Sequence, residues 1–272
     1  MGDDAPGARR SFDRVADVYD RTRGLPPEAT AAVTAGIAGV LRAAVDSPCV
    51  LDVGVGTGRI AGPLAEAGIR VVGVDIAPAM LARARARRVP VAVADAAALP
   101  FGPARFDGAL FVHLLHLVPD PAAVLRAAFA VVRPGGVVLV GRTNYAGSLL
   151  ARAHLLVWHT VEELGGPRRP ADWNALATAA LTAVAGERGA VLDERVVARW
   201  TERATGRRLL DDLEHRVYSS TWAISDALMS TLLATLAPRA AALFGDLDRP
   251  AETEVSFSLV VARLPRDDDA AL

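Results

Sequence analysis

The chain has 272 residues, 52% of them hydrophobic, and a formal net charge of −1. This length and composition suit one α/β domain with additions, and the balanced charge excludes the overall basic field that holds nucleic acid. All of the basic residues are Arg, so the arginines clustered over 83–88 are interpreted as a solvated helix face rather than a phosphate-binding one.

Cys49 is the only cysteine, which excludes a disulfide framework within the chain and fits a reducing cytoplasm. The first residues lack the apolar core of a signal peptide, and no stretch approaches 18 uninterrupted apolar residues. Histidines and carboxylates do not cluster in the way that a metal site requires. We therefore expect a cytoplasmic protein that needs no metal and binds neither a membrane nor nucleic acid.

The N-terminal part of the chain precedes the first predicted strand. Residues 1–10 are small, polar and charged, which indicates disorder. Apolar residues recur at helical spacing over 11–23, and a second helix is predicted over 28–45. These helices, 11–45 together, are expected either to lie over the carboxyl edge of a sheet as a lid or to flank the core.

The segment from Cys49 to Asp75 is predicted as a strand, a glycine loop, a helix and a second strand that ends at an acid. The short β-branched run that opens it is typical of a strand buried on both faces. Gly54, Gly56 and Gly58 then alternate with other residues, at positions where side chains would keep a ligand away from the backbone. Asp75 lies close to where a nucleotide-binding βαβ unit places its ribose-binding carboxylate. The segment therefore predicts a site for a nucleoside-bearing ligand.

Strand and helix continue to alternate after this segment. Helices are predicted over 78–88 and 122–132, strands over 89–94, 106–112 and 137–141, and a turn at 133–136. Loops this short predict a parallel, doubly wound sheet whose ligand-binding core is 49–141.

The pattern changes from residue 142 onward. Helical segments over 142–188 and 206–245 flank a strand predicted over 190–205, and an alternating run over 252–264 predicts a closing strand. The helical segments are expected to be insertions on the substrate side of a single domain, 1–272.

Several residues argue against a dinucleotide as the ligand. A dinucleotide loop takes G-x-G-x-x-G, whereas here the third glycine comes one residue early and Arg59 holds the place of the last. Asp52 stands at the mouth of the loop, where a carboxylate opposes a pyrophosphate but suits an ammonium or a sulfonium. Asp75 can accept from ribose hydroxyls, and Asp95, at the next strand end, is within reach of an adenine amino group. Three acids at successive strand ends predict a ligand with a cationic head, a ribose and an adenine.

The chain contains, in order, the segments LDVGVGTG, VVGVDIAPAML, ADAAALPF, FDGALFVHLLHLVPD and RPGG. In this order and spacing they resemble a class I SAM-dependent methyltransferase of the small-molecule (ubiquinone/menaquinone, type 11) branch, over residues 11–141. The resemblance implies S-adenosylmethionine as methyl donor and S-adenosylhomocysteine as product. It also implies a Rossmann-like, doubly wound sheet of seven strands whose last strand is antiparallel, with N-terminal lid helices and with helical insertions after strands 5 and 6.

The resemblance further implies which residues contact the cofactor. In chain order these are Tyr19 and Arg23 of the lid, Asp52, Gly54 and Gly56 at the methionine part, Asp75 at the ribose, Ile76 and Met80 around adenine, Asp95 and Ala96 at its amino edge, and the backbone of Val112 or His113 at the ammonium.

Some of these residues also have an explanation that needs no ligand. Gly54 and Gly56 are what the turn alone requires, and Asp95 suits a turn cap. Tyr19 has the spacing of a core residue of its helix, and Arg23 fits a surface charge. The sequence leaves both explanations open.

Histidine is the candidate base for an acceptor oxygen, because its ordinary pKa suits proton removal near neutral pH. His113 directly follows the fourth predicted strand, where acceptor and methyl group should meet, and is the first candidate. His154 and His159 lie on the first insertion and are weaker candidates for contact with the acceptor. His116 is expected to hold its own loop through backbone hydrogen bonds, and His215 to be structural or exposed.

The two insertions carry a set of large side chains, namely Tyr145, Trp158, Trp173, Tyr218, Trp222 and Met229. One interpretation is an apolar chamber for the acceptor beside the methyl donor. The other is that these side chains form a homodimer interface or simply thicken the core.

Three functions therefore compete. The first is transfer of a methyl group from S-adenosylmethionine to the oxygen or carbon of a small, partly apolar metabolite. The second is binding of the same cofactor without methylation, in regulation or in another reaction. The third, an NAD-type oxidoreductase, is disfavoured by Asp52 and by the missing last glycine. We expect the first.

Overall fold

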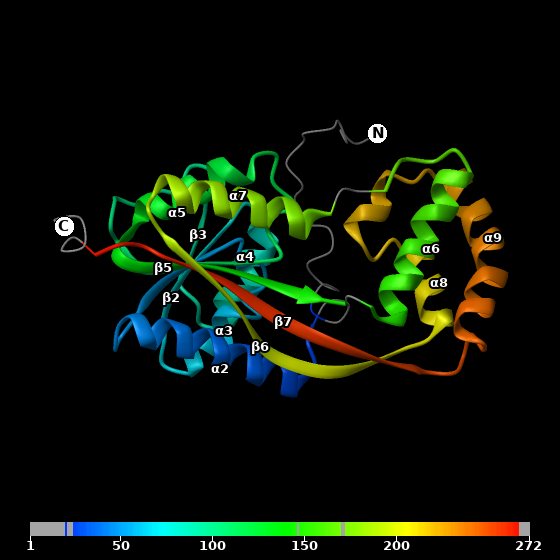
Figure 1. Cartoon of the computed structure of the whole chain (residues 1–272), viewed down its shortest axis with the longest axis horizontal. Helices are drawn as coiled ribbons and strands as arrows, with labels where there is room; N and C mark the ends of the chain where they lie inside the picture. The colour runs from blue at the N-terminus through cyan, green and yellow to red at the C-terminus, as the bar shows by residue number, and fades with distance from the viewer. Residues whose placement is uncertain (1–19, 21–23, 146, 170–171, 267–272) are drawn as a thin grey trace. The chain divides into compact units, whose positions relative to one another are not determined.

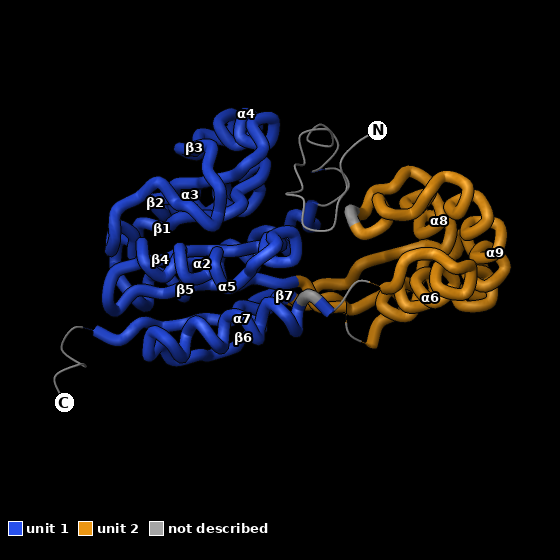
Figure 2. The backbone as a smooth tube through the Cα atoms, turned by 90° about the horizontal axis from the view of Figure 1, so that it is seen from above, with its two compact units in different colours: residues 1–142, 172–198, 257–272 blue, residues 143–171, 199–256 orange. Residues whose placement is uncertain are grey.

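The computed structural model describes residues 20, 24–145, 147–169 and 172–266. Two compact units are found (Figure 2): unit 1 comprises residues 1–142, 172–198 and 257–272, and unit 2 comprises residues 143–171 and 199–256. The predicted disorder over 1–10, nearly all of the first lid helix, Tyr19 and Arg23 lie outside the described residues. That the whole chain acts as a single cofactor-binding domain stays a prediction.

The strands are β1 (Cys49–Val53), β2 (Arg70–Asp75), β3 (Val91–Val93), β4 (Phe106–Val112), β5 (Val132–Asn144), β6 (Val191–Ala204) and β7 (Ala251–Arg263). The helices of unit 1 are α2 (Pro27–Ala44), α3 (Ala61–Glu66), α4 (Pro78–Ala86), α5 (Pro121–Val131) and α7 (Trp173–Glu187). Those of unit 2 are α6 (Leu149–Glu163), α8 (Gly206–Glu214), the 3-10 helix η2 (Ser219–Ala223) and α9 (Asp226–Phe244).

The strands form one sheet in the order β3-β2-β1-β4-β5-β7-β6. β1 pairs in parallel with β2 and β4, β2 pairs in parallel with β3, and β4 pairs in parallel with β5. β7 runs antiparallel to β5, because Gly135 near the start of β5 donates to the carbonyl oxygen of Pro265, just after the end of β7, and Leu264 donates to that of Gly136. The predicted doubly wound sheet of seven strands with an antiparallel last strand is confirmed.

Helix ends in unit 1 follow the residues that the sequence offers for them. The carboxylate of Asp120 accepts a hydrogen bond from the N–H of Ala123 at 2.9 Å, and Pro121 occupies the first position of α5. Asp172 caps α7 in the same way. These local signals place the connections between strands, and with them the loops at the carboxyl edge of the sheet.

Helices cover both faces of the sheet in unit 1 (Figure 1): α2 and α3 lie on one face, and α5 and α7 on the other. Leu181 and Val184 of α7 are buried in one cluster with Phe111 of β4 and Phe129 of α5. α7 is therefore part of the sheet's core, whereas the segment 142–188 was expected to lie outside it. The Ala-rich sequence of α7 does not mark which of its faces is buried.

Both ends of β5 differ from the sequence prediction. The turn predicted at 133–136 is wrong, because these residues belong to β5 and pair with the end of β7. Gly135 has a φ of 73°, and the register between β4 and β5 shifts nearby. At its other end β5 continues to Asn144, and α6 begins only after Ser148, whose side chain accepts from the N–H of Ala151.

Unit 2 has a hydrophobic core of its own. Trp158 of α6 and Met229 of α9 are buried in this core together with Leu232 and Leu236. Trp158 and Met229 were two of the large side chains considered for an acceptor chamber. The structure places both in a hydrophobic core instead.

The other large side chains of that set differ from these two. Tyr145, Tyr218 and Trp222 are half-buried, and the side chain of Trp173 lies outside what the structure describes. The contacts that the structure defines for Tyr145, Tyr218 and Trp222 are with other residues of unit 2.

α9 is long and apolar enough to cross a membrane, by length and composition alone. Helices that form protein cores meet the same criterion. Within unit 2, α9 contacts both α6 and α8 and buries Leu232 and Leu236.

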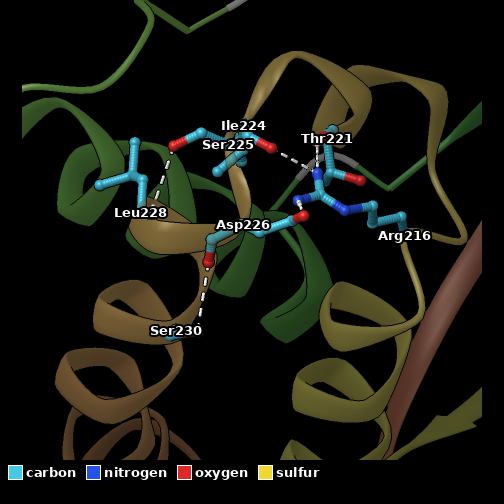
Figure 3. Close-up of polar contacts among 7 residues, drawn as sticks. All are labelled: Arg216, Thr221, Ile224, Ser225, Asp226, Leu228 and Ser230. Carbon is cyan, nitrogen blue, oxygen red and sulfur yellow. Dashed lines mark hydrogen bonds and ion pairs between the residues drawn. The ribbon is translucent and has the colours of Figure 1, made fainter. Parts of the chain in front are cut away.

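Arg216 organises the loop between α8 and α9 (Figure 3). Its guanidinium donates to the backbone oxygens of Thr221 and Ile224 and to the carboxylate of Asp226, the last at 2.6 Å. In return, the indole N–H of Trp222 donates to the carbonyl oxygen of Arg216 at 3.0 Å. These bonds hold the loop against the first turn of α9.

Candidate functional site

A pocket of about 270 Å³ lies at the carboxyl edge of the sheet in unit 1. Carboxyl ends of parallel strands meet at one edge, so residues that follow β1, β2, β3 and β4 share its wall. The predicted cofactor contacts that line it are Gly54, Gly56, Asp75, Ile76, Met80, Asp95, Ala96 and Val112. The candidate base His113 lines the same pocket. The fold thus gathers into one cavity residues that are far apart in the sequence.

The glycine loop after β1 needs glycine for its backbone. Gly54, Gly56 and Gly58 have φ values of 75°, 55° and 76°, in the left-handed region that side chains disfavour. A Cβ on Gly54 would also lie 2.7 Å from the side chain of Leu114, and one on Gly58 would lie 3.1 Å from the Cα of Ala84 in α4. Gly58 therefore serves helix packing, whereas Gly54 and Gly56 border the pocket.

Asp75 ties the glycine loop to the end of β2. One carboxylate oxygen accepts from the N–H of Gly56 at 2.9 Å, and the other accepts from the N–H of Ala77 at 2.9 Å. Asp75 also lines the pocket, and a carboxylate oxygen can accept more than one hydrogen bond. Asp75 is thus a structural acceptor for the loop and an acceptor in the pocket wall.

Asp95 shows the same double arrangement at the end of β3. Its carboxylate accepts from the N–H of Ala97 at 3.1 Å, as a turn cap does, and the residue also lines the pocket. The turn-cap explanation therefore holds without removing Asp95 from the pocket wall.

Asp52 lies in β1 and differs from the other two acids. Its side chain is only 3% exposed, and it is not among the residues that line the pocket. Burial, reinforced by the negative charge of Asp75 and opposed by the positive charge of Arg59, raises the pKa of Asp52 to about 7. With a pKa in this range, the carboxyl group of Asp52 changes charge near neutral pH.

His113 follows β4 with a φ of 56°, a left-handed conformation that is uncommon for a residue with a side chain. Such backbone strain is found where the surrounding structure dictates a side chain's position. His113 and Leu114 also line a second, much smaller pocket of about 40 Å³, to which His116 contributes. His113 thus stands between two cavities.

His154 and His159, the other candidate bases, belong to α6 in unit 2. His154 packs edge-on against Tyr218 with ring centroids 5.6 Å apart. Dense surroundings lower the pKa of His154, although part of its side chain reaches solvent, and the charge of Asp212 opposes this shift. His159 is largely exposed and its Nδ1 lies 3.1 Å from a carboxylate oxygen of Glu163.

Asp20 and Arg87 form a clasp on the glycine loop that the sequence did not reveal. The carboxylate of Asp20 accepts from the hydroxyl of Thr57 at 2.5 Å and from the guanidinium of Arg87 at 2.7 Å. Arg87 also donates to the carbonyl oxygen of Thr57 at 2.6 Å. Arg87 is exposed, as the interpretation of the arginines at 83–88 expected, but it also pairs with residues far from it in the sequence. The sequence feature that could have pointed to Asp20 is its position beside Tyr19 in the predicted lid.

Replacing Arg87 with Ala tests whether this clasp pre-organises the loop. The ion pair is partly exposed, so its own contribution to stability is at most about 1 kcal/mol. We expect Arg87→Ala to weaken S-adenosylhomocysteine binding by roughly 3- to 10-fold, because the freed loop must be ordered on binding. Calorimetry measures this, with Arg85→Ala on the same helix as control. Equal affinities of both variants would show that the clasp plays no part.

The loop between β4 and α5 supplies further wall residues that were not singled out from the sequence, namely Leu114, Leu117, Val118 and Pro119. The available signal was an apolar run in a loop, where solvent exposure would otherwise favour polar residues. The pocket thus combines apolar surface for a flat ring with carboxylates for hydroxyl and amino groups. That combination fits an adenosine. No group of three or more His, Cys, Asp or Glu residues that could hold a metal is found in the described part of the chain.

Comparison with known proteins finds relatives of the segment that carries this pocket. Residues 51–140 match the family of methyltransferase domains (Methyltransf_11). Over 110 residues the chain is 36% identical to the ubiquinone biosynthesis O-methyltransferase of Pseudomonas paraeruginosa, an overlap of 38% of this chain and 47% of that protein. Over 134 residues it is 35% identical to the demethylmenaquinone methyltransferase of Corynebacterium kroppenstedtii, an overlap of 47% and 56%. The chain spans about half the length of these curated relatives.

Solved structures share the fold at low sequence identity. A SAM-dependent methyltransferase of Thermotoga maritima superposes with a TM-score of 0.53 at 19% identity, covering 93% of this chain and 98% of its own. The YcgJ protein of Bacillus subtilis superposes with a TM-score of 0.53 at 15% identity, covering 85% and 99%. Residues 51–140 thus match the methyltransferase-domain family, and the chain shares the fold of these methyltransferase structures.

Proposed function

We propose that the protein transfers a methyl group from S-adenosylmethionine to an oxygen or carbon atom of a small, partly apolar metabolite. One observation carries this proposal: residues from four strand ends, with Asp75 and Asp95 among them, line a single pocket beside His113. Two of the relatives named above act on quinone precursors by their names, which favours a ring-bearing acceptor. The family match covers residues 51–140, and the proposed activity is that of the whole chain.

The predicted cofactor contacts suit the parts of S-adenosylmethionine in turn. Asp75 would accept from the ribose hydroxyls, and Asp95 with the backbone of Ala96 would face the adenine amino edge. Ile76 and Met80 would enclose the adenine ring from the apolar side of the pocket. Asp52 would stabilise the positive end of the cofactor from within β1. Tyr19 and Arg23 of the predicted lid remain proposed contacts with the methionine carboxylate.

S-adenosylmethionine, when bound, supplies a methyl group on a positively charged sulfur, which an acceptor atom attacks in line. His113 would accept the proton that an acceptor hydroxyl loses as it forms the new bond to carbon. The apolar wall of the β4–α5 loop would exclude water from that position. The acceptor itself need only be held in line, so most of the catalytic effect would come from positioning.

The remaining parts of the proposal concern the setting of the enzyme. The lone, unpaired Cys49 suits a cytoplasmic location. A homodimer is the proposed alternative to a monomer. The proposed acceptor is a small molecule, and the charge balance of the chain favours neither nucleic acid nor a membrane as partner.

Calorimetry and a transfer assay test this proposal in two steps. The first step measures binding of S-adenosylmethionine, S-adenosylhomocysteine and NAD, with tight binding expected only for the first two. The second measures methyl transfer to phenolic, quinone and polyketide-like acceptors. Binding of S-adenosylmethionine without transfer to any acceptor would support the non-methylating alternative. Tighter binding of NAD than of S-adenosylmethionine would contradict the proposal that S-adenosylmethionine is the cofactor of this chain.

Replacing His113 tests its role as base. We expect His113→Ala to lower kcat by roughly 100-fold or more, because a general base of this kind contributes about 10²–10⁴ to the rate. The affinity for S-adenosylhomocysteine should stay within about threefold, since only the backbone of His113 is proposed to face the cofactor. The rise of kcat with pH that reports deprotonation of the base should disappear in the variant.

His215→Ala is the matched control, because His215 is exposed at the end of α8 and bonds through Nδ1 to the carbonyl oxygen of Asp211. Its kinetics should equal those of the parent chain. An unchanged kcat in His113→Ala, together with a reduced kcat in His154→Ala or His159→Ala, would move the role of base to α6.

A further inference from the structure

The small pocket beside His113 lies where β4 and β5 end and α7 begins. It measures about 40 Å³, and the polar residues of its wall are His113, His116, Arg142, Asn174 and Thr178. The rest of its wall is apolar, from residues such as Phe111 and Leu115. A space of this size admits roughly a water molecule or a carboxylate group. It shares two lining residues, His113 and Leu114, with the larger pocket, so the two cavities adjoin there.

Arg142 is held rigidly in this wall. One terminal nitrogen donates to the hydroxyl oxygen of Thr178 at 2.7 Å, and the other donates to a carboxylate oxygen of Glu194 at 2.6 Å. Thr178 in turn donates to the carbonyl oxygen of Asn174 at 2.7 Å, which orients its oxygen toward the guanidinium. Arg142 is only 20% exposed, whereas its partner Glu194 is 47% exposed.

One donor of Arg142, its Nε, is buried without a hydrogen-bond partner among the described residues. A buried donor that is left unsatisfied loses the hydrogen bond it makes with water in the unfolded chain, and folded proteins rarely retain such a group without a reason. The pocket that Arg142 lines is where such a partner would be accommodated.

We propose that Arg142 binds an anionic oxygen of the methyl acceptor, most simply a carboxylate, in this small pocket. The inference rests on the proposed function, since it assigns a binding group for the acceptor of that reaction. A guanidinium suits a carboxylate because its donors lie in one plane with the spacing of the two oxygens. With the anionic group at Arg142, the rest of the acceptor extends past His113, which lines both cavities. Arg142 is then a specificity-determining residue, and His113 remains the proton acceptor.

Glu194 competes with that ligand for the same guanidinium. Glu194 is the negatively charged group that pairs with Arg142. The other titratable residues that line the pocket are the two histidines, His113 and His116. Because Glu194 is half exposed, its hold on Arg142 is screened by solvent and adds little to stability. Removing the Glu194 charge should therefore strengthen binding of an anionic ligand. Removing Arg142 should abolish the pocket's preference for an anionic over a neutral ligand.

Benzoate and benzamide test this assignment, because they share a ring and differ in the charge of one group. Binding of each is measured by calorimetry to the full chain saturated with S-adenosylhomocysteine, at pH 7.5. We expect the parent chain to bind benzoate at least about 10-fold more tightly than benzamide. Arg142→Gln should abolish this ratio, and Glu194→Gln should increase it. Arg133→Gln, which removes an ion-paired arginine from the other end of β5, should leave the ratio unchanged.

A purely structural role of Arg142 gives a different pattern. Losing either partner of the Arg142–Glu194 pair would then weaken both ligands alike, with parallel falls in melting temperature. Equal binding of benzoate and benzamide to the parent chain, or a ratio that survives in Arg142→Gln, overturns the inference, and a water molecule is then the partner of Nε. Failure of the proposed function is distinguishable, because it appears as absent methyl transfer in the parent chain, whatever these binding ratios are.

Discussion

Asp75→Ala is expected to weaken binding of both S-adenosylmethionine and S-adenosylhomocysteine by at least about 100-fold. Two contributions add up. The first is the loss of charge-assisted hydrogen bonds to the ribose, each worth about 1.5–3 kcal/mol. The second is the loss of the bonds that Asp75 accepts from Gly56 and Ala77, which shape the glycine loop. Calorimetry with both ligands measures the sum.

A comparison with 2′-deoxy-S-adenosylhomocysteine separates the two contributions. In the parent chain, removing the 2′-hydroxyl should reduce affinity by about 10-fold or more, whereas in Asp75→Ala it should change affinity little. A ratio that is the same in both proteins would mean that Asp75 shapes the loop without contacting the ribose. Asp120→Ala is the matched control, because Asp120 also lines the pocket while its carboxylate caps α5.

Asp52→Asn is expected to stabilise the ligand-free protein while weakening cofactor binding. Asp52 is buried with a pKa raised to about 7 from an ordinary value of 3.8. Between these pH values the folded state binds a proton that the unfolded state has released, so the free energy of unfolding falls as pH rises from about 4 to about 7. Above that range the cost is constant. The variant avoids it and should gain roughly 1–3 kcal/mol at pH 8, measured by denaturant unfolding.

Cofactor affinity should respond in the opposite sense. A cation bound near Asp52 favours the ionised carboxyl, so affinity in the parent chain should rise as pH increases through about 7. In Asp52→Asn the affinity should be lower by roughly 10- to 100-fold at pH 8 and nearly independent of pH. A variant that binds the cofactor as tightly as the parent at pH 8 would contradict the assignment of Asp52 to the cofactor's positive end.

S-adenosylhomocysteine shows which cation Asp52 serves. It retains the ammonium group of S-adenosylmethionine but has a neutral sulfur. Equal losses for the two ligands in Asp52→Asn would assign Asp52 to the ammonium. A loss confined to S-adenosylmethionine would assign it to the sulfonium, and with it to the transferred methyl group.

Signals that act over a few residues were readable from the sequence. The alternating glycines after β1 indicate a tight turn, and Gly54 and Gly56 have φ values of 75° and 55°, which residues with a Cβ rarely adopt. Asp120 and Pro121 predict the start of α5 because a cap and a fixed φ act within one turn of helix. Two of the three predicted acids, Asp75 and Asp95, meet in one pocket because parallel strands end at the same edge, whereas Asp52 is buried within β1.

Signals that depend on distant partners were not readable in the same way. Arg87 looks like its exposed neighbours until Asp20 and Thr57 are placed beside it. The sequence RPGG has the composition of a turn, yet it extends β5 because the end of β7 supplies its hydrogen-bond partners.

Arg142 gives the clearest division between the two kinds of information. Its position just after a β-branched run predicts only that it lies near a strand end. Its partners Thr178 and Glu194 come from α7 and β6, far along the chain, and they determine that its charge is fixed in the wall of a pocket. The sequence by itself predicted the fold, the cofactor class and the acids Asp75 and Asp95 of the pocket wall, because these follow from local backbone geometry and strand order. Only the tertiary structure decided which arginines face the site, because the burial and pairing of a long charged side chain depend on elements that the local sequence does not contain.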